Sequence, residues 1–454
     1  MSAEISIDPI IDASHGRAVP TALVGAGAVM MLVGLLAIAY GFLVAGAAWT
    51  WGALVVGLVY TFAIAQGGVM FSVLQTGTWG RWGRPFKRIA ETFFFAMPFA
   101  YVVLALFLLL GGLSIYVWNP DTIIPGGMIP LEPHSSEAVR SKPIWLTTGF
   151  VSARLLLGFA WIMLVDFIYI RASLGPDLLL AKQRLGGKAP GWWNLFIGGH
   201  TDVQKAVDAG QRTQSNLAPI IGISYAAVFT IMAMDLLMSL SPLWYSNMFP
   251  GWIAVSSFWM SLAALAALSM LLRDWLGLRD VIRSNNTHDL GKFMLAGCMF
   301  WGYTTFAQIL PIYYTNMPEE TEYLLVRMVL PTWSPFSQLV AITCFVAPFT
   351  ILLSRGIKKM RWPFFGIAML IMTGIFFERS LLVMPQVFMG DEFPLVNFVI
   401  VYGGVWIGAM GLVLTVVTQF LARVPAVVIS DPHLGTHPWD VHVSSLDAVG
   451  HAHH

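Results

Sequence analysis

Polar side chains interrupt several apolar stretches of the sequence and could carry protons. They are Gln66, Arg154, Asp166, Asp235, Gln308, Glu378 and Arg379. A charged residue within a membrane-spanning helix costs about 2.5–3.5 kcal/mol on insertion scales, so such residues usually face the protein interior and mark a pathway. Carboxylates can bind and release protons, while amides, hydroxyls and water can relay them. The alternative is that these groups form ion pairs that join helices.

Along the helices that must position them, these side chains fall into two layers. The outer layer lies about 8–13 Å from the outer helix ends, at a rise of about 1.5 Å per residue. It holds Arg154, Asp235, Gln308, Glu378 and Arg379, whereas Glu91 and Asp166 lie near the inner ends and Gln66 lies closer to the middle. We predict two half-channels for protons that open to opposite sides. Water and four tyrosines would connect them: Tyr60, Tyr101, Tyr225 and Tyr303.

Asp166 is the strongest candidate for a proton carrier in the inner layer. Arg171 lies little more than a helical turn away, so it is a possible neutralising partner. Glu91 follows the basic residues Arg84, Lys87 and Arg88, which we assign to an inner loop. We expect that loop to neutralise Glu91.

The outer layer is equally compatible with a pathway and with ion pairing. As ion pairs, Arg154 would pair with Asp235 on the next span, and Arg379 would pair with Glu378 or with another acid. Glu378 and Arg379 are neighbours in sequence and diverge on the helix surface. We therefore expect each of them to have a partner on a different helix.

The composition requires a membrane around these groups. Of 454 residues, 57% are hydrophobic and only 11% are charged, and the mean hydropathy is +0.73. A soluble globular chain has about 25% charged residues, so this chain has too little polar surface to face water all round. The balance of 25 basic against 24 acidic residues gives no basic excess for nucleic acid. A soluble enzyme, a disordered protein and a nucleic-acid binder are excluded, and an all-α, multi-pass membrane protein remains.

Ten stretches are long enough to cross a bilayer core, which takes roughly 20 apolar residues per helix. They are residues 21–45, 52–75, 89–113, 145–170, 218–240, 249–272, 289–316, 333–354, 362–385 and 396–421. Lys and Arg gather in the tails and in the loops of one side, which predicts that both termini are cytoplasmic. The chain then divides into a cytoplasmic N-terminal tail (1–20), a ten-helix transmembrane domain (21–421) and a cytoplasmic, histidine-bearing tail (422–454).

A faint internal repeat suggests how the ten helices are grouped. RWGRPFKRIAETFFFAMPF leads into the third span much as LRDVIRSNNTHDLGKFMLAG leads into the seventh, at a shift of about 200 residues. This predicts two four-helix bundles, made of spans two to five and six to nine. Spans one and ten would be peripheral.

Histidine and cysteine positions limit the cofactors. None of the ten histidines lies well inside a predicted span, and a membrane haem generally needs axial histidines from the helices. Two cysteines, Cys298 and Cys344, are too few for a cysteine-ligated iron–sulfur cluster. The tail residues His433, His437, His442, His451, His453 and His454 are expected to be solvated. We expect no metal, haem or cluster bound by this chain's own side chains.

Prolines at the outer ends of three spans suggest a pocket. Pro242, Pro311 and Pro385 each remove a backbone hydrogen bond and can open a helix. The nearby aromatic residues are Trp244, Tyr245, Tyr313 and Tyr314. Together with Pro311 they would hold a planar, lipid-soluble head group such as a quinone, or a lipid. The alternative is an aromatic belt at the membrane surface.

These outer segments resemble a known family. MDLLMSLSPLWYSNMFPGW (234–252) and FWGYTTFAQILPIYYTNMPEET (300–321) are similar to a pair of signatures in the ten-helix membrane subunits of alternative complex III, a bacterial quinol oxidoreductase. Those subunits belong to the polysulfide-reductase (NrfD-like) superfamily, and the likeness covers about residues 21–421. It is nearer to the second of the two subunits than to the paralogue that oxidises menaquinol.

The resemblance implies a place in a larger assembly in the bacterial cytoplasmic membrane, in respiratory or photosynthetic electron transport. The partners it implies are the quinol-oxidising paralogue, a periplasmic iron–sulfur subunit with a molybdopterin-enzyme-like domain, c-type cytochromes and lipids. Haem and iron–sulfur clusters would lie in those partners. The sequence departs from the quinol-oxidising pattern because it has no intramembrane histidine to pair with a carboxylate. We expect a subunit that supports its paralogue and conducts protons, with no catalysis by the isolated chain; the alternatives are a secondary transporter and a structural scaffold.

Overall fold

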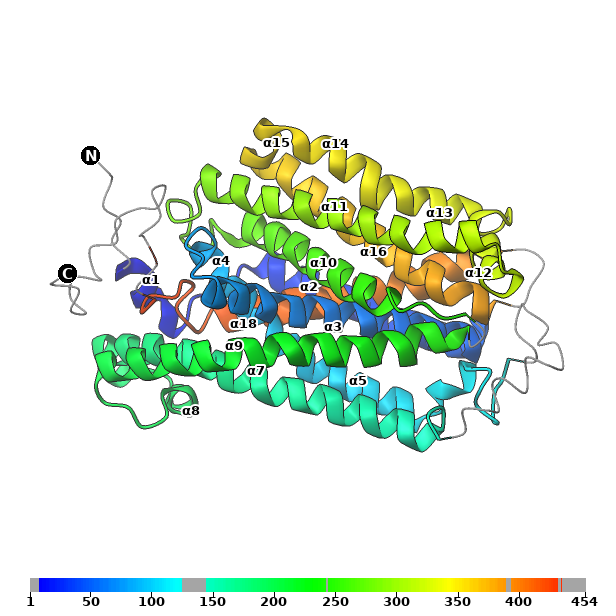
Figure 1. Cartoon of the computed structure of the whole chain (residues 1–454). Helices are drawn as coiled ribbons and strands as arrows, with labels where there is room; N and C mark the ends of the chain where they lie inside the picture. The colour runs from blue at the N-terminus through cyan, green and yellow to red at the C-terminus, as the bar shows by residue number, and fades with distance from the viewer. Residues whose placement is uncertain (1–7, 125–143, 242–243, 389–392, 432–433, 435–454) are drawn as a thin grey trace.

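Every predicted apolar stretch forms a helix in the computed structural model, because a helix satisfies its backbone hydrogen bonds within the segment. The structure describes residues 8–124, 144–241, 244–388, 393–431 and 434, and this part of the chain contains no strand. Ten of its helices are long and apolar enough to cross a membrane, which confirms the all-α fold and the number of spans. They lie side by side in one elongated bundle (Figure 1).

The spans follow the chain in order, with short helices between them. The first five are α2 (Thr21–Tyr40), α3 (Ala47–Gly77), α4 with α5 (Arg84–Thr92 and Met97–Leu109), α7 (Thr148–Leu185) and α9 (Val203–Met232). The last five are α10 (Phe249–Leu272), α11 (Ser284–Thr315), α13 with α14 (Ser334–Ala341 and Ala347–Leu353), α16 (Arg361–Val387) and α18 (Gly404–Leu421). The short helices are α1 (Asp8–Asp12), α8 (Asn194–Ile197), α12 (Pro318–Met328), α15 (Arg355–Lys359) and α17 (Leu395–Asn397).

Helix α3 lies at the centre of the bundle. It contacts α5, α9, α10, α16 and α18, and nearly all of its residues are buried. Small residues permit the close approach, since a Cβ on Gly67 would lie 2.3 Å from the Cβ of Ser261 on α10. The buried polar groups in the middle of α3 therefore need partners inside the protein.

Helices α2 and α18 form a pair at the edge of the bundle. Their backbones meet at glycines, because a Cβ on Gly34 would lie only 2.7 Å from the Cα of Gly408. Association through small residues is typical of helices in lipid, where the hydrophobic effect does not drive packing. The other faces of α2 expose large apolar side chains such as Leu35 and Leu36.

Two helices continue well past the predicted inner boundary. The sequence predicts spans over 145–170 and 218–240, but α7 ends at Leu185 and α9 begins at Val203. The 38 residues of α7 make a helix of about 57 Å, against a bilayer core of about 30 Å. The inner stretch 172–217 is thus largely two projecting helices, and only residues 186–202 connect them.

The described ends of the chain meet at this same inner end of the bundle (Figure 1). The backbone N–H of Arg17 donates to the carbonyl of Ala422 over 2.8 Å. Residues 424–431, which follow α18, pack inward with buried Val424, Val427 and Ile429. We call residues 424–431 the C-terminal segment.

Candidate functional site

A line of hydroxyl groups at the inner end of α3 leads to a buried carboxylate. Thr76 Oγ1 and Tyr169 OH are 2.8 Å apart, and Tyr169 OH and Ser72 Oγ are 3.1 Å apart. Ser72 then donates to Glu91 Oε1 over 2.8 Å, and Ser173 donates to the same carboxylate from α7. A chain of this kind can pass a proton by reorienting its hydroxyls.

Arg88 joins two carboxylates beside this line. Its guanidinium donates to Glu91 over 2.6 Å and also to Asp177 on α7, and all three side chains are buried. Asp177 further accepts from the backbone N–H groups of Ile429 and Ser430, over 3.2 and 2.7 Å. Buried ion pairs need such additional hydrogen bonds to offset the loss of hydration. The cluster thus joins α4, α7 and the C-terminal segment.

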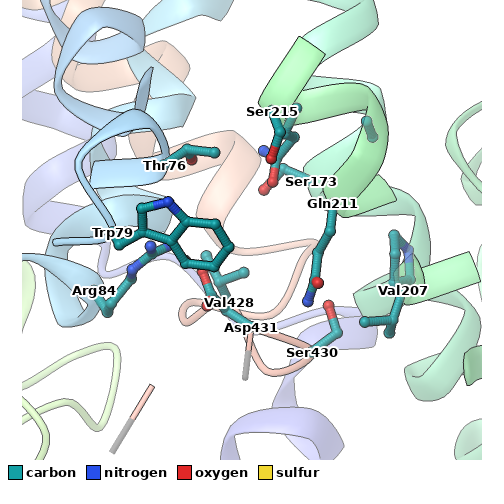
Figure 2. A pocket seen from close by; sticks show the side chains of 13 residues that line it. Thr76, Trp79, Arg84, Ser173, Val207, Gln211, Ser215, Val428, Ser430 and Asp431 are labelled. Atoms are coloured by element: carbon teal, nitrogen blue, oxygen red, sulfur yellow. The ribbon is translucent and has the colours of Figure 1, made fainter. Parts of the chain in front are cut away.

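A second buried ion pair ties the C-terminal segment to α4. Asp431 accepts from Arg84 and, over 3.2 Å, from Lys87. Beside this pair is a cavity of about 60 Å³ that Thr76 and Ser173 also line, so it adjoins both ends of the hydroxyl line. Figure 2 shows Arg84, Ser173 and Asp431 around it. A cavity of this size has room for water molecules that could connect the line to the inner surface.

The structure corrects the predicted loop around Glu91. Arg84, Lys87 and Arg88 belong to the buried helix α4 instead of an inner loop, and Arg88 neutralises Glu91 deep inside the protein. The signal was in the sequence: with Glu91, these residues have the spacing i, i+3, i+4 and i+7, which places them on one helix face. A search for uninterrupted apolar runs passes over that face.

Asp166 on α7 and Gln66 on α3 lie closer to the middle of the membrane than the line of hydroxyl groups does. Both side chains are fully buried, and Gln66 Nε2 donates to Asp166 Oδ1 over 3.4 Å. Asp166 precedes Tyr169 by three residues and Ser173 by seven, so all three share one face of α7. Arg171 is exposed beside Gly198, and among the described residues Asp166 takes part in no ion pair. The alternative in which Arg171 neutralises Asp166 therefore has no support among the described contacts.

In the outer layer, Arg154 and Asp235 form a two-pronged ion pair. Arg154 Nε and Nη2 donate to the two oxygens of Asp235, each over 2.6 Å. Asp235 lies in a one-turn π-helix (Ala233–Leu237), a wide turn that interrupts the span. Such turns free backbone groups, and Tyr116 fills one gap by donating to the carbonyl of Leu236 over 2.9 Å. The pairing alternative for these two residues is thus confirmed.

Glu378 and Arg379 each have a partner on a different helix, as predicted. They form an ion pair with each other, and each also reaches another helix. Glu378 accepts from Trp301 Nε1 on α11 over 2.7 Å, and Arg379 donates to Ser256 on α10 over 2.6 Å. The ion pair between the two neighbours is the one that the pairing alternative offers for Arg379. Gln308, half-buried on α11, instead donates to the carbonyl of Thr304 on its own helix.

In the described part of the chain, none of the four tyrosines predicted between the layers forms a direct hydrogen bond to a polar side chain of either layer. Tyr60, Tyr101 and Tyr225 donate to the backbone carbonyls of Met372, Leu156 and Ala254. Tyr303 is 63% exposed and lies on the face of α11 that points away from the bundle. The inner and outer polar groups therefore remain separate clusters among the described side chains.

The aromatic residues at the outer end do not form the predicted pocket. Tyr245, Tyr313 and Tyr314 are between 66% and 77% exposed, as expected of an aromatic belt. Trp244 is buried against Tyr323 of α12, with ring centroids 3.9 Å apart. Pro311 lies inside α11, which continues to Thr315, so this proline does not end the helix. Pro242 lies outside the described residues.

Metal ligation and similarity give no further assignment. In the part of the chain that the structure describes, no group of three or more His, Cys, Asp or Glu side chains could hold a metal ion. The six histidines of the tail lie outside the described residues. Comparisons of the sequence with models of known protein families and with curated proteins find no match. The fold and the site define a class of protein, a multi-pass helical membrane protein with buried carboxylates. We call the group of Arg88, Glu91 and Asp177, together with Gln66 and Asp166, the inner cluster.

Proposed function

We propose that this chain is a membrane subunit of a quinol:electron-acceptor oxidoreductase of the alternative complex III type, in the position of quinone-binding subunit 2 (ActF). In the bacterial cytoplasmic membrane it would pack against the ten-helix paralogue that oxidises quinol. An iron–sulfur subunit and c-type cytochromes would complete the assembly. The resemblance of segments 234–252 and 300–321 supports this assignment.

Within that assembly, the chain conducts protons through its inner half. The observation that carries this proposal is the hydrogen-bonded line from the inner cavity through Thr76, Tyr169 and Ser72 to Glu91. Asp166 continues the polar face of α7 toward the middle of the membrane, where Gln66 of α3 donates to it. Quinol oxidation releases electrons and protons at one place, and carboxylates and hydroxyls can carry only the protons.

The helix contacts are compatible with the two four-helix units that the repeat predicts, joined where α3 packs on α10 and α16. One set of neighbours is α3, α5, α7 and α9, and the other is α10, α11, α13 with α14, and α16. The α2 and α18 pair is peripheral in this arrangement. The excess of Lys and Arg in the loops of the inner end supports a cytoplasmic location for both termini.

Replacing Asp166 with asparagine should lower the number of protons moved per electron while quinol-driven electron transfer continues. Asparagine keeps the shape of the side chain but cannot bind and release a proton. We expect the flux through this line to fall on the order of tenfold or more, as for the loss of a positioned acid–base group. The measurement is proton release against cytochrome reduction by the complex in liposomes.

The control for this prediction is Gln308→Leu. Gln308 is half-buried and bonds to its own helix, so its loss should leave the proton-to-electron ratio unchanged. An unaltered ratio in Asp166→Asn would remove the inner pathway from the proposal.

The assembly makes a separate prediction. Solubilised gently from its native membrane, the tagged chain should co-purify with haem-containing subunits, visible as c-type cytochrome absorption in the same elution peak. Haem would come from the partners, since none is expected on this chain. Isolation of the chain alone, active in substrate uptake, would favour the secondary transporter instead.

A further inference from the structure

Asp166 and Gln66 leave two buried oxygen atoms without a hydrogen bond. One hydrogen bond connects the two side chains, donated by Gln66 Nε2 to Asp166 Oδ1. Asp166 Oδ2 and Gln66 Oε1 are both buried, and among the described groups neither has a partner. A buried polar atom without a partner is strongly destabilising, more so if it carries charge.

The other buried carboxylates of the spans are all compensated. Glu91 and Asp177 share Arg88, Asp235 pairs with Arg154, and Glu378 pairs with Arg379. No ion pair involving Asp166 occurs in the described part of the chain. An ionised Asp166 would thus be an isolated charge in the protein interior, which is the least favourable state for a carboxylate.

One added proton satisfies both unpaired atoms. A protonated carboxylic acid has an O–H donor, and a primary amide offers a carbonyl acceptor beside its N–H donors. With the proton on Asp166 Oδ2, that oxygen can donate to Gln66 Oε1 while Gln66 Nε2 donates to Asp166 Oδ1. Acid and amide then exchange two hydrogen bonds, and no charge remains uncompensated.

We infer that Asp166 holds a proton in the resting protein, as a neutral acid paired with Gln66, and that this pair is a proton-storage site at the deep end of the inner line. The presence of the proton follows from the pair itself. Only its passage to and from Glu91 rests on the proposed function.

The thermal stability of single variants in the intact complex tests the inference. Asp166→Asn replaces a neutral acid by an amide that can form the same two bonds with Gln66, so its melting temperature should stay close to that of the unaltered protein. Asp177→Asn is the matched control on the same helix face. It removes a compensated charge beside Arg88, so its melting temperature should fall by several degrees.

Infrared spectroscopy gives an independent readout. The carbonyl band of a protonated carboxylic acid should be present in the unaltered protein and absent in Asp166→Asn. In Gln66→Leu it should persist and move to higher frequency, since the acid loses its partner. The inference would be overturned if Asp166→Asn lost as much stability as Asp177→Asn, or if the carbonyl band stayed unchanged in Asp166→Asn. It would also be overturned if the melting temperature of the unaltered protein depended on sodium, since a sodium ion would then take the place of the proton between the two oxygens. Normal proton translocation in Asp166→Asn, with the band lost, would overturn the proposed function and leave the neutral acid in place.

Discussion

The Arg88→Met variant should fail to accumulate as folded protein. Arg88 is fully buried and compensates Glu91 and Asp177 at once, so its loss leaves two buried carboxylates without a cation. Breaking one buried ion pair by removing a partner costs about 3–5 kcal/mol. Two carboxylates share this cation, and the total stability of a folded domain is only about 5–15 kcal/mol. The measurement is the yield of monodisperse protein in gel filtration, with the melting temperature of whatever remains.

Arg81→Met is the matched control, because Arg81 is exposed just before α4. It should give a normal yield. A variant that combines Arg88→Met with Glu91→Gln and Asp177→Asn removes all three charges and should recover part of the folded protein, since a neutral cluster of similar shape leaves no bare charge. Equal yields of Arg88→Met and Arg81→Met would show that Arg88 does not hold the cluster together.

The ten spans could be predicted from the sequence because lipid imposes one strong constraint on each. About 20 apolar residues must follow one another, and a simple search detects such runs. The projecting turns of α7 and α9 carry charged residues and so lack that signal. They are helices because they continue a helix already formed and pack on each other, as Gly210 of α9 does against the carbonyl of Ala172 on α7.

The inner cluster was only half predictable. Asp166 and Gln66 stood out as polar residues in apolar runs, and the structure brings them together. The role of Arg88 required knowing that α4 is buried from all sides, which depends on the C-terminal segment packing against it. That contact joins residues more than 300 positions apart, such as Arg84 and Asp431, and a short-range pattern holds no information about it.

The surroundings of the outer aromatic residues could not be predicted for a similar reason. Trp244 is buried by Tyr323 of α12. This helix lies at the outer end of the bundle, and its sequence contains no long apolar run from which it could be predicted. Arg327 of the same helix lies over the Tyr323 ring, 3.6 Å from its centroid. Burial raises the pKa of the Tyr323 hydroxyl, as expected of a ring enclosed between these two side chains. The three surface tyrosines follow the general rule for membrane interfaces instead.

Asp235→Ala should destabilise the protein by about 3–5 kcal/mol, because it leaves the guanidinium of Arg154 without its carboxylate inside the outer half of the bundle. Arg154→Met should have an effect of similar size for the converse reason. The double variant Arg154→Met with Asp235→Leu should be more stable than either single variant, since apolar side chains of similar volume often replace a buried ion pair without loss. Melting temperatures of the four proteins in one detergent complete the cycle.

This cycle also separates the two carboxylates that the sequence treats alike. Both oxygens of Asp235 accept hydrogen bonds from Arg154, so a proton on either oxygen would weaken the ion pair, whereas Asp166 Oδ2 has no cation beside it and can hold a proton. If the single variants of Arg154 and Asp235 were as stable as the unaltered protein, the ion pair would not stabilise the fold. Asp235 would then become a candidate carrier for an outer half-channel. If they are unstable and the double variant recovers, the ion pair holds α7 to the π-helix that follows α9, and Asp235 is a structural partner of Arg154.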